Sequence, residues 1–278
     1  MTALLATAAA ALFGTSDFLG GLASRRVAAV LATLVAQLVG LGIFVVISLL
    51  TPGAVLTRQD LILGVVAGVA GGTGVLSLYA GLATGRMSVV APITAALSGS
   101  LPAVVSAFRG ETVPPVGIAG ILLALGAVLL VSVAAADEGT GSAKLALVYS
   151  VVAGIGFAGS MLCYAETTTT SGVLPLVPAR LTTVTLLVTL ALARRTGFSM
   201  DGRTRSIALF AGAVDAFANW SLVVALRLGP VAIASVLSSL YPVTTVVLAR
   251  VVLSERVTGL QRAGMAMAML AVVLSALA

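Results

Sequence analysis

The sequence predicts an all-α polytopic membrane protein with ten transmembrane helices, arranged as two inverted repeats of five helices. First, 60% of its 278 residues are hydrophobic and only 9% are charged, whereas soluble domains carry about 25% charged residues. Second, apolar runs close to the ~20 residues needed to cross a ~30 Å hydrocarbon core recur along the chain. Third, one half of the chain repeats the other at a spacing of 144 positions.

Apolar runs of spanning length are separated by loops too short to hold a soluble domain. The predicted spans are 3–23, 28–50, 61–84, 88–108, 116–136, 143–165, 173–192, 207–227, 231–252 and 259–277. A polar linker at 137–142 separates the fifth span from the sixth. The chain is therefore predicted to consist of one five-helix repeat at 1–136 and a second at 143–278.

The repeat is clearest where residues 227–255 align without a gap on residues 83–111, so that Glu255 falls on Glu111. Each copy holds five spans, and an odd number makes the second copy enter the membrane from the opposite side. Inverted repeats of this kind are the architecture of many secondary transporters. A duplication kept only for stability is the alternative.

Basic residues gather in the loops after the odd-numbered spans. They are Arg25, Arg26, Arg86, Lys144, Arg194, Arg195, Arg203, Arg205, Arg250, Arg256 and Arg262, against Arg58, Arg109 and Arg227 on the other side. The positive-inside rule then predicts cytoplasmic odd loops and external termini in a bacterial inner (plasma) membrane. This placement also explains the net charge of +6 without a nucleic-acid partner.

The chain contains no histidine and one cysteine, Cys163. This composition excludes a disulfide within the chain, histidine-based metal sites and a Ser-His-Asp triad. We therefore expect a protein that is not an enzyme and that uses neither a metal nor a cofactor.

Three charged residues lie inside predicted spans, where a charge is costly: Asp17, Arg180 and Asp215. Asn219 follows Asp215 by four positions and so shares its helix face. We expect the three charges to meet in a shared interior, where two carboxylates face one guanidinium. The excess acid suits proton exchange or a cationic substrate; a static ion pair between the seventh and eighth spans is the alternative for Arg180.

Further polar side chains are candidates for the same interior. Gln37 precedes Arg180 by 143 positions and so occupies the equivalent site of the first repeat. Tyr164, Tyr241 and Ser98 are expected to line the cavity with them, whereas Tyr79 is interpreted as an interfacial anchor or core residue. Because proline removes a helix hydrogen bond, Pro92 and Pro242 are predicted hinges.

The segment LSSLYPVTTVVLARVVLSERVTGLQRAG resembles the EamA-type transporters of the drug/metabolite transporter superfamily, through Pro242, Glu255 and Gly264. The first half departs from this motif, since Ser98 stands in place of the proline. Arg180 matches an arginine that this family often carries, and FGTSDFLGG followed by two arginines is similar to an actinobacterial-type subgroup.

The resemblance implies a central cavity formed by spans 1, 3, 4, 6, 8 and 9, flanked by 2 and 7, with 5 and 10 outside. It also implies cytoplasmic termini, opposite to the charge count. The expected function is alternating-access secondary transport of a small polar or amphipathic metabolite, amino-acid-like or drug-like, by proton-coupled export. The expected partners are this substrate and membrane lipids, for a monomer or homodimer. The alternative function is a flippase for a lipid-linked or nucleotide-linked head group, which an intramembrane arginine would also bind.

The excess carboxylate generates a first prediction. Asp17→Asn and Asp215→Asn should each abolish pH-driven transport while leaving the protein folded, because the amide cannot exchange a proton. Transport into proteoliposomes under an imposed pH gradient measures this effect, and size-exclusion chromatography checks folding. Full activity in both variants would contradict the assignment.

Overall fold

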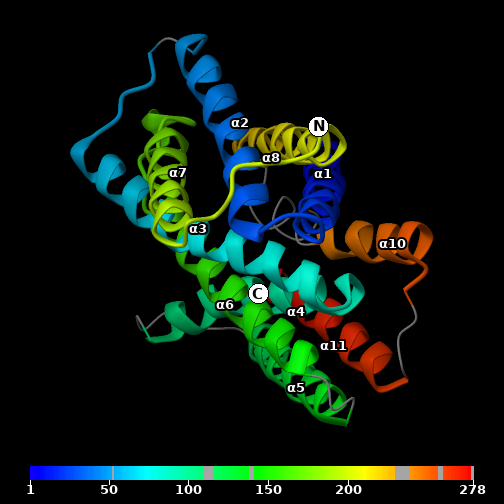
Figure 1. Cartoon of the computed structure of the whole chain (residues 1–278). Helices are drawn as coiled ribbons and strands as arrows, with labels where there is room; N and C mark the ends of the chain where they lie inside the picture. Colours follow the sequence, from blue (N-terminus) through cyan, green and yellow to red (C-terminus); the bar gives the residue numbers. More distant parts are fainter. Residues whose placement is uncertain are drawn as a thin grey trace.

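The computed structural model describes residues 1–51, 53–108, 115–137, 141–228, 238, 240–255 and 259–276, and this part of the chain contains α-helices and no strand (Figure 1). The helices are α1 (Thr2–Ser24), α2 (Ala29–Leu49), α3 (Arg58–Thr84), α4 (Met87–Phe108), α5 (Pro115–Asp137), α6 (Gly141–Ala165), α7 (Leu176–Ala193), α8 (Gly202–Leu228), α10 (Tyr241–Leu253) and α11 (Gly259–Ala276), with a short 3-10 helix, η1, at Thr169–Ser171. Five stretches are long and apolar enough to cross a membrane by length and composition: Leu4–Ser24, Ala29–Leu49, Arg58–Thr84, Ser142–Ala165 and Leu176–Ala193.

The helices follow the predicted spans closely, with differences at a few ends. The first part of the predicted span 231–252 lies outside the described residues, and α10 begins at Tyr241. Of the predicted linker 137–142, Asp137 belongs to α5, α6 already begins at Gly141, and 138–140 lie outside the described residues. Glu111, which the repeat pairs with Glu255, also lies outside them.

The starts of α3 and α8 lie three and five residues before the predicted ones because each helix extends to a polar cap. At α3, the Thr57 hydroxyl accepts from the Asp60 N–H at 3.1 Å and the Asp60 carboxylate accepts from the Thr57 N–H, which makes a capping box. At α8, Asp201 accepts from the Thr204 N–H at 3.0 Å. The two caps lie 144 positions apart, although the acid and the hydroxyl have exchanged places.

The start of α7 is later than predicted. Residues 169–171 form the 3-10 helix η1, Gly172 has a φ of +59°, and Pro175 is the N-cap residue. Asp60 fixes this segment to α3, since its carboxylate accepts from the N–H and the hydroxyl of Thr168 at 2.7 and 2.8 Å.

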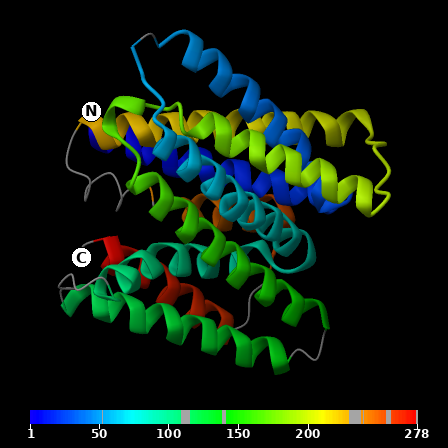
Figure 2. The same cartoon turned by 90° about the vertical axis from the view of Figure 1, so that its left-hand side faces the viewer.

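The helices pair across the two halves of the chain. α3 packs along α6, α1 packs along α8, and the contacts of α2 with α7 and of α4 with α10 also join the halves. α5 and α11 pack on each other at one edge, and α2 and α7 lie toward the opposite edge (Figure 2). The start of α1 and the end of α11 lie at the same end of the bundle (Figure 2).

Two glycines that lie 144 positions apart make the same kind of helix crossing. A Cβ added to Gly68 of α3 would overlap the carbonyl oxygen of Ala179 in α7, and one added to Gly212 of α8 would overlap that of Ala36 in α2. Ala36 and Ala179 are themselves within one position of the repeat spacing. Small residues allow helices in lipid to approach this closely.

The two prolines predicted as hinges have different surroundings. Pro92 lies inside α4 and is buried, so it removes one internal hydrogen bond of that helix. Pro242 lies in the first turn of α10, where the missing N–H needs no partner within the helix. A kink inside a helix is therefore expected at Pro92, and the hinge role of both residues stays a prediction.

The glycine crossings generate a second prediction. Gly68→Ala and Gly212→Ala should each lower the free energy of unfolding by about 1–3 kcal/mol, the usual cost of overpacking, because the added methyl meets a backbone carbonyl. Gly42→Ala is the matched control, since nothing lies within 4 Å of its added Cβ. Thermal unfolding in detergent measures all three, and unchanged melting temperatures for the first two would contradict these crossings.

Candidate functional site

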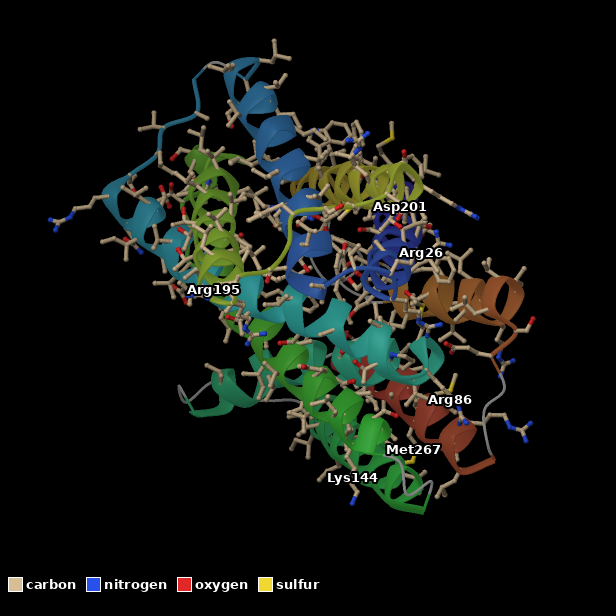
Figure 3. All side chains as sticks on the ribbon, in the orientation of Figure 1. Arg26, Arg86, Lys144, Arg195, Asp201 and Met267 are labelled. Atoms are coloured by element: carbon tan, nitrogen blue, oxygen red, sulfur yellow. The ribbon has the colours of Figure 1, made fainter. Side chains whose placement is uncertain are left out.

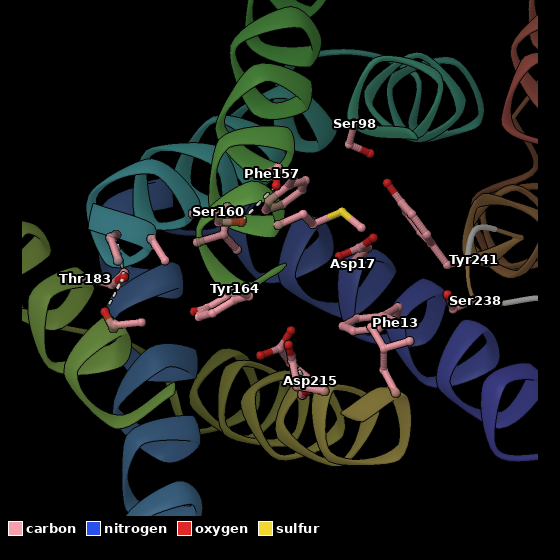
Figure 4. Close-up of a pocket in the computed structure, with 18 of the residues that line it drawn as sticks. Phe13, Asp17, Ser98, Phe157, Ser160, Tyr164, Thr183, Asp215, Ser238 and Tyr241 are labelled. Atoms are coloured by element: carbon pink, nitrogen blue, oxygen red, sulfur yellow. Dashed lines mark hydrogen bonds between the residues drawn. The ribbon is translucent and has the colours of Figure 1, made fainter. Parts of the chain in front are cut away.

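A cavity of about 240 Å³ lies among the helices at the centre of the bundle (Figure 4). Side chains from α1, α2, α3, α4, α6, α7, α8 and α10 line it. All eight residues that the sequence suggests as binding residues are part of this lining: Asp17, Gln37, Ser98, Tyr164, Arg180, Asp215, Asn219 and Tyr241. The structure thus brings the candidates together, and their roles in binding stay a prediction.

Arg180 of α7 holds the polar side of the cavity together. Its Nη1 donates to Oε1 of Gln37 in α2, and its Nη2 forms an ion pair with Oδ2 of Asp215 in α8. The guanidinium also lies over the ring of Phe44, 5.6 Å from the ring centre, which allows a cation–π interaction. The guanidinium therefore already contacts three side chains, those of Gln37, Asp215 and Phe44.

The glycine crossings explain why Arg180 reaches both partners. Ala179, which contacts Gly68, directly precedes Arg180, and Ala36, which contacts Gly212, directly precedes Gln37. The hydroxyl of Thr183 adds a hydrogen bond of 2.8 Å to the carbonyl of Gly68. These backbone contacts hold α7 against α3 and α2 against α8 at the level of the ion pair.

Asp215 and Asn219 lie on one face of α8, as their spacing predicts, and both line the cavity. The side-chain amide of Asn219 donates to the backbone carbonyl of Asp215 at 2.8 Å. Asn219 therefore stabilises its own helix while it faces the cavity.

Asp17 enters the cavity from α1 (Figure 4). Two hydrogen bonds hold its helix: the Ser16 hydroxyl donates to the carbonyl of Ala211 in α8 at 2.9 Å, and the Thr245 hydroxyl of α10 donates to the carbonyl of Gly14 at 3.1 Å. Within the described part of the chain, neither the hydrogen bonds nor the ion pairs include the Asp17 carboxylate. Its position is thus fixed while its carboxylate faces the cavity.

Two pairs of residues that face the cavity lie at the predicted repeat spacing, within one position. Phe13 of α1 and Phe157 of α6 form one such pair, and Gln37 and Arg180 form another. Ser98 of α4 lies opposite the ring of Tyr241 (Figure 4). The cavity therefore lies where corresponding parts of the two halves meet.

Phe13 and Met161 also line the cavity, and both were missed by sequence reasoning. The repeat spacing of 144 could have identified both residues. Phe13 lies 144 positions before Phe157, and Met161 lies 144 positions after Asp17, which was a candidate. The walls formed by α1 and α6 therefore differ at this position, since α1 carries the carboxylate of Asp17 and α6 carries the thioether of Met161.

One end of the bundle carries the arginine-rich loops, and Arg26, Arg86, Lys144 and Arg195 lie across it in Figure 3. We call it the arginine-rich end. Arg25 closes this end, since its Nε donates to the carbonyl of Leu82 and its Nη2 reaches the carbonyl of Gly85 and Oε1 of Glu255, each at 3.1 Å.

Two further contacts complete the closure. Glu255, at the end of α10, also accepts from the backbone N–H of Met87 at 3.0 Å. Below this layer the ring of Tyr79, which is 2% exposed, fills the space over Gly20 so completely that a Cβ there would overlap it. Tyr79 is therefore a core residue of this end, and the alternative of an interfacial anchor is wrong.

In the second half of the chain, the helices at a spacing of 144 from α1 and α3 are arranged differently. α1 packs against α3, whereas α6 and α8 face each other across the cavity (Figure 4). Tyr164, which follows Gly20 by 144 positions, lines the cavity and packs against the cluster of Phe44, Val173, Leu176 and Ala216. The described residues contain no group of three or more His, Cys, Asp or Glu side chains that could hold a metal ion.

Residues 144–277 match the EamA-like transporter family. A comparison of the sequence with curated proteins gives no match. The second half of the chain is thus an EamA-like transporter domain, of the drug/metabolite transporter superfamily, in a multi-pass membrane protein. This is a family of transporters and not of enzymes.

The Arg180 contacts generate a third prediction. Arg180→Met should lower the free energy of unfolding by about 1–3 kcal/mol: breaking a buried ion pair costs more, but the side chains of Arg180 and Asp215 are 13% and 21% exposed. Adding Asp215→Asn should recover part of the loss, because no unpaired carboxylate remains. Thermal unfolding of the two single variants and the double variant measures this coupling.

Arg58→Met is the matched control, since Arg58 is exposed at the start of α3. Strictly additive losses for Arg180→Met and Asp215→Asn would contradict the coupling.

Proposed function

We propose that the protein is a secondary active transporter that exports a small polar or amphipathic metabolite by alternating access. The observation that supports this proposal is a charged central cavity that is closed at the arginine-rich end. Arg25, Glu255 and Tyr79 make this closure, and α6 and α8 face each other across the cavity (Figure 4). A site that opens on one side at a time must be closed on the other.

The proposed architecture is ten spans in two inverted repeats, at 1–136 and 143–278. The recurrent crossings of Gly68 with Ala179 and of Gly212 with Ala36 support it. So does the direction of the helices, because Arg25 follows the end of α1 and Lys144 lies at the start of α6, both at the arginine-rich end. Corresponding helices α1 and α6 thus run in opposite directions.

The positive-inside rule supports a cytoplasmic arginine-rich end in a bacterial inner membrane. The present conformation is then one whose cytoplasmic side is closed, and both termini are external. In this proposal the excess carboxylate of the cavity provides the proton or cation site, and Arg180 and Asp215 form the fixed pair around which the halves move.

The closure generates a fourth prediction, which tests alternating access without a known substrate. Gly20→Val should shift the population toward the opposite conformation, because its side chain would overlap the ring of Tyr79. The reporter is Met161→Cys in the cavity, in a Cys163→Ser background that removes the natural thiol. A membrane-impermeant maleimide should label this cysteine from the arginine-rich side about tenfold faster in Gly20→Val, a change that corresponds to ~1.4 kcal/mol.

Gly42→Val is the matched control, since nothing lies within 4 Å of the added Cβ, and it should leave labelling from both sides unchanged. If Gly20→Val labels at the same rates as the parent from both sides, the arginine-rich end does not open, and alternating access is wrong.

A further inference from the structure

The charges that line the cavity do not balance. Among the described lining residues, Asp17 and Asp215 are carboxylates and Arg180 is the cation. Arg180 and Asp215 neutralise each other in their ion pair. The net formal charge of the lining is therefore the single negative charge of Asp17. A pocket with this balance favours a ligand that carries one positive charge, because like charges at close range cost free energy.

An anionic ligand has no comparable partner here. The two terminal nitrogens of Arg180 are bonded to Gln37 and Asp215, and its flat face covers Phe44. A ligand carboxylate at Arg180 would lie beside the Asp215 carboxylate, and two like charges at close range cost free energy. The geometry therefore disfavours anchoring a substrate carboxylate at Arg180.

The walls around Asp17 suit the apolar body of an amine. Phe13 and Tyr241 lie in an edge-to-face arrangement, with ring centres 6.4 Å apart, and Phe157 lines the cavity from α6. Aromatic faces attract cations and pack against flat apolar groups. The volume of the cavity, about 240 Å³, lies near the lower end of the ~300–1,000 Å³ that is usual for small-molecule pockets.

We propose that the cavity binds a small organic monocation, an ammonium group on a short apolar or aromatic body, with the ammonium at Asp17 and the body between the aromatic side chains. This inference rests on the proposed transport function and deepens it by naming the charge and size of the substrate. Asp17 of α1 and Asp215 of α8 line the same cavity and are like charges, so a cation between α1 and α8 also relieves their repulsion.

Three probes of nearly equal shape and different charge test the proposal: 2-phenylethylamine, 2-phenylethanol and phenylacetate at pH 7. The measurement is the concentration-dependent rise in melting temperature of the purified full chain, which gives a dissociation constant for each probe. We expect the ammonium probe to bind at least about tenfold more tightly than the alcohol or the carboxylate, as a desolvated charge pair provides.

Variants locate the effect at Asp17. Asp17→Asn should remove the preference for the ammonium probe, and Asp17→Glu should retain it because the charge remains. Asp201→Asn is the matched control, since it makes the same chemical change at the exposed cap of α8, outside the cavity. Size-exclusion chromatography shows whether each variant is folded before binding is compared.

Four outcomes would overturn the inference: tighter binding of phenylacetate, equal binding of the three probes, no response to millimolar 2-phenylethylamine in the folded protein, or an undiminished preference in Asp17→Asn. None of these outcomes affects the labelling experiment at Met161, which needs no ligand. The two experiments therefore test the charge of the substrate and the alternating-access mechanism independently.

Discussion

The ion pair between Arg180 and Asp215 is the interaction on which the rest of the structure depends. A lone charge within an apolar bundle is costly, so each of these side chains requires the other. The pair joins α7 to α8, and the bond to Gln37 adds α2. Removing any one partner leaves a polar group facing the cavity without its bond, so the three helices must keep this arrangement whatever the outer ends of the bundle do.

Backbone contact makes this pairing possible. Lipid tails are as apolar as leucine, so no hydrophobic force drives helices together within the membrane. Gly68 and Gly212 instead allow α3 to touch α7 and α8 to touch α2. The residues they touch, Ala179 and Ala36, directly precede Arg180 and Gln37, so the crossings that stabilise the bundle also set the geometry of the charged site.

Much of this could be predicted from the sequence, because lipid imposes simple rules on composition. Apolar runs predicted most of the helices to within a few residues, although the cap at Asp201 extends α8 beyond its apolar part and α7 begins later than predicted. The cost of intramembrane charge selected Asp17, Arg180 and Asp215. Which carboxylate pairs with Arg180 could not be predicted, because it depends on distances between helices far apart in sequence. The closure by Tyr79 was missed for the same reason, since only the fold brings its ring over Gly20.

Two ion pairs among the described residues differ in their position. Arg25 and Glu255 meet at the arginine-rich end, where their side chains are 28% and 9% exposed, and Arg180 and Asp215 meet in the central cavity, where theirs are 13% and 21% exposed. Opening that end exposes both groups to water, which compensates each for the lost bond. Separating Arg180 from Asp215 would instead leave two carboxylates, Asp17 and Asp215, lining the cavity without a bonded cation. In the proposed transport cycle the motion should therefore break the outer pair and turn about the inner one, so that the charge balance around Asp17 persists in both conformations.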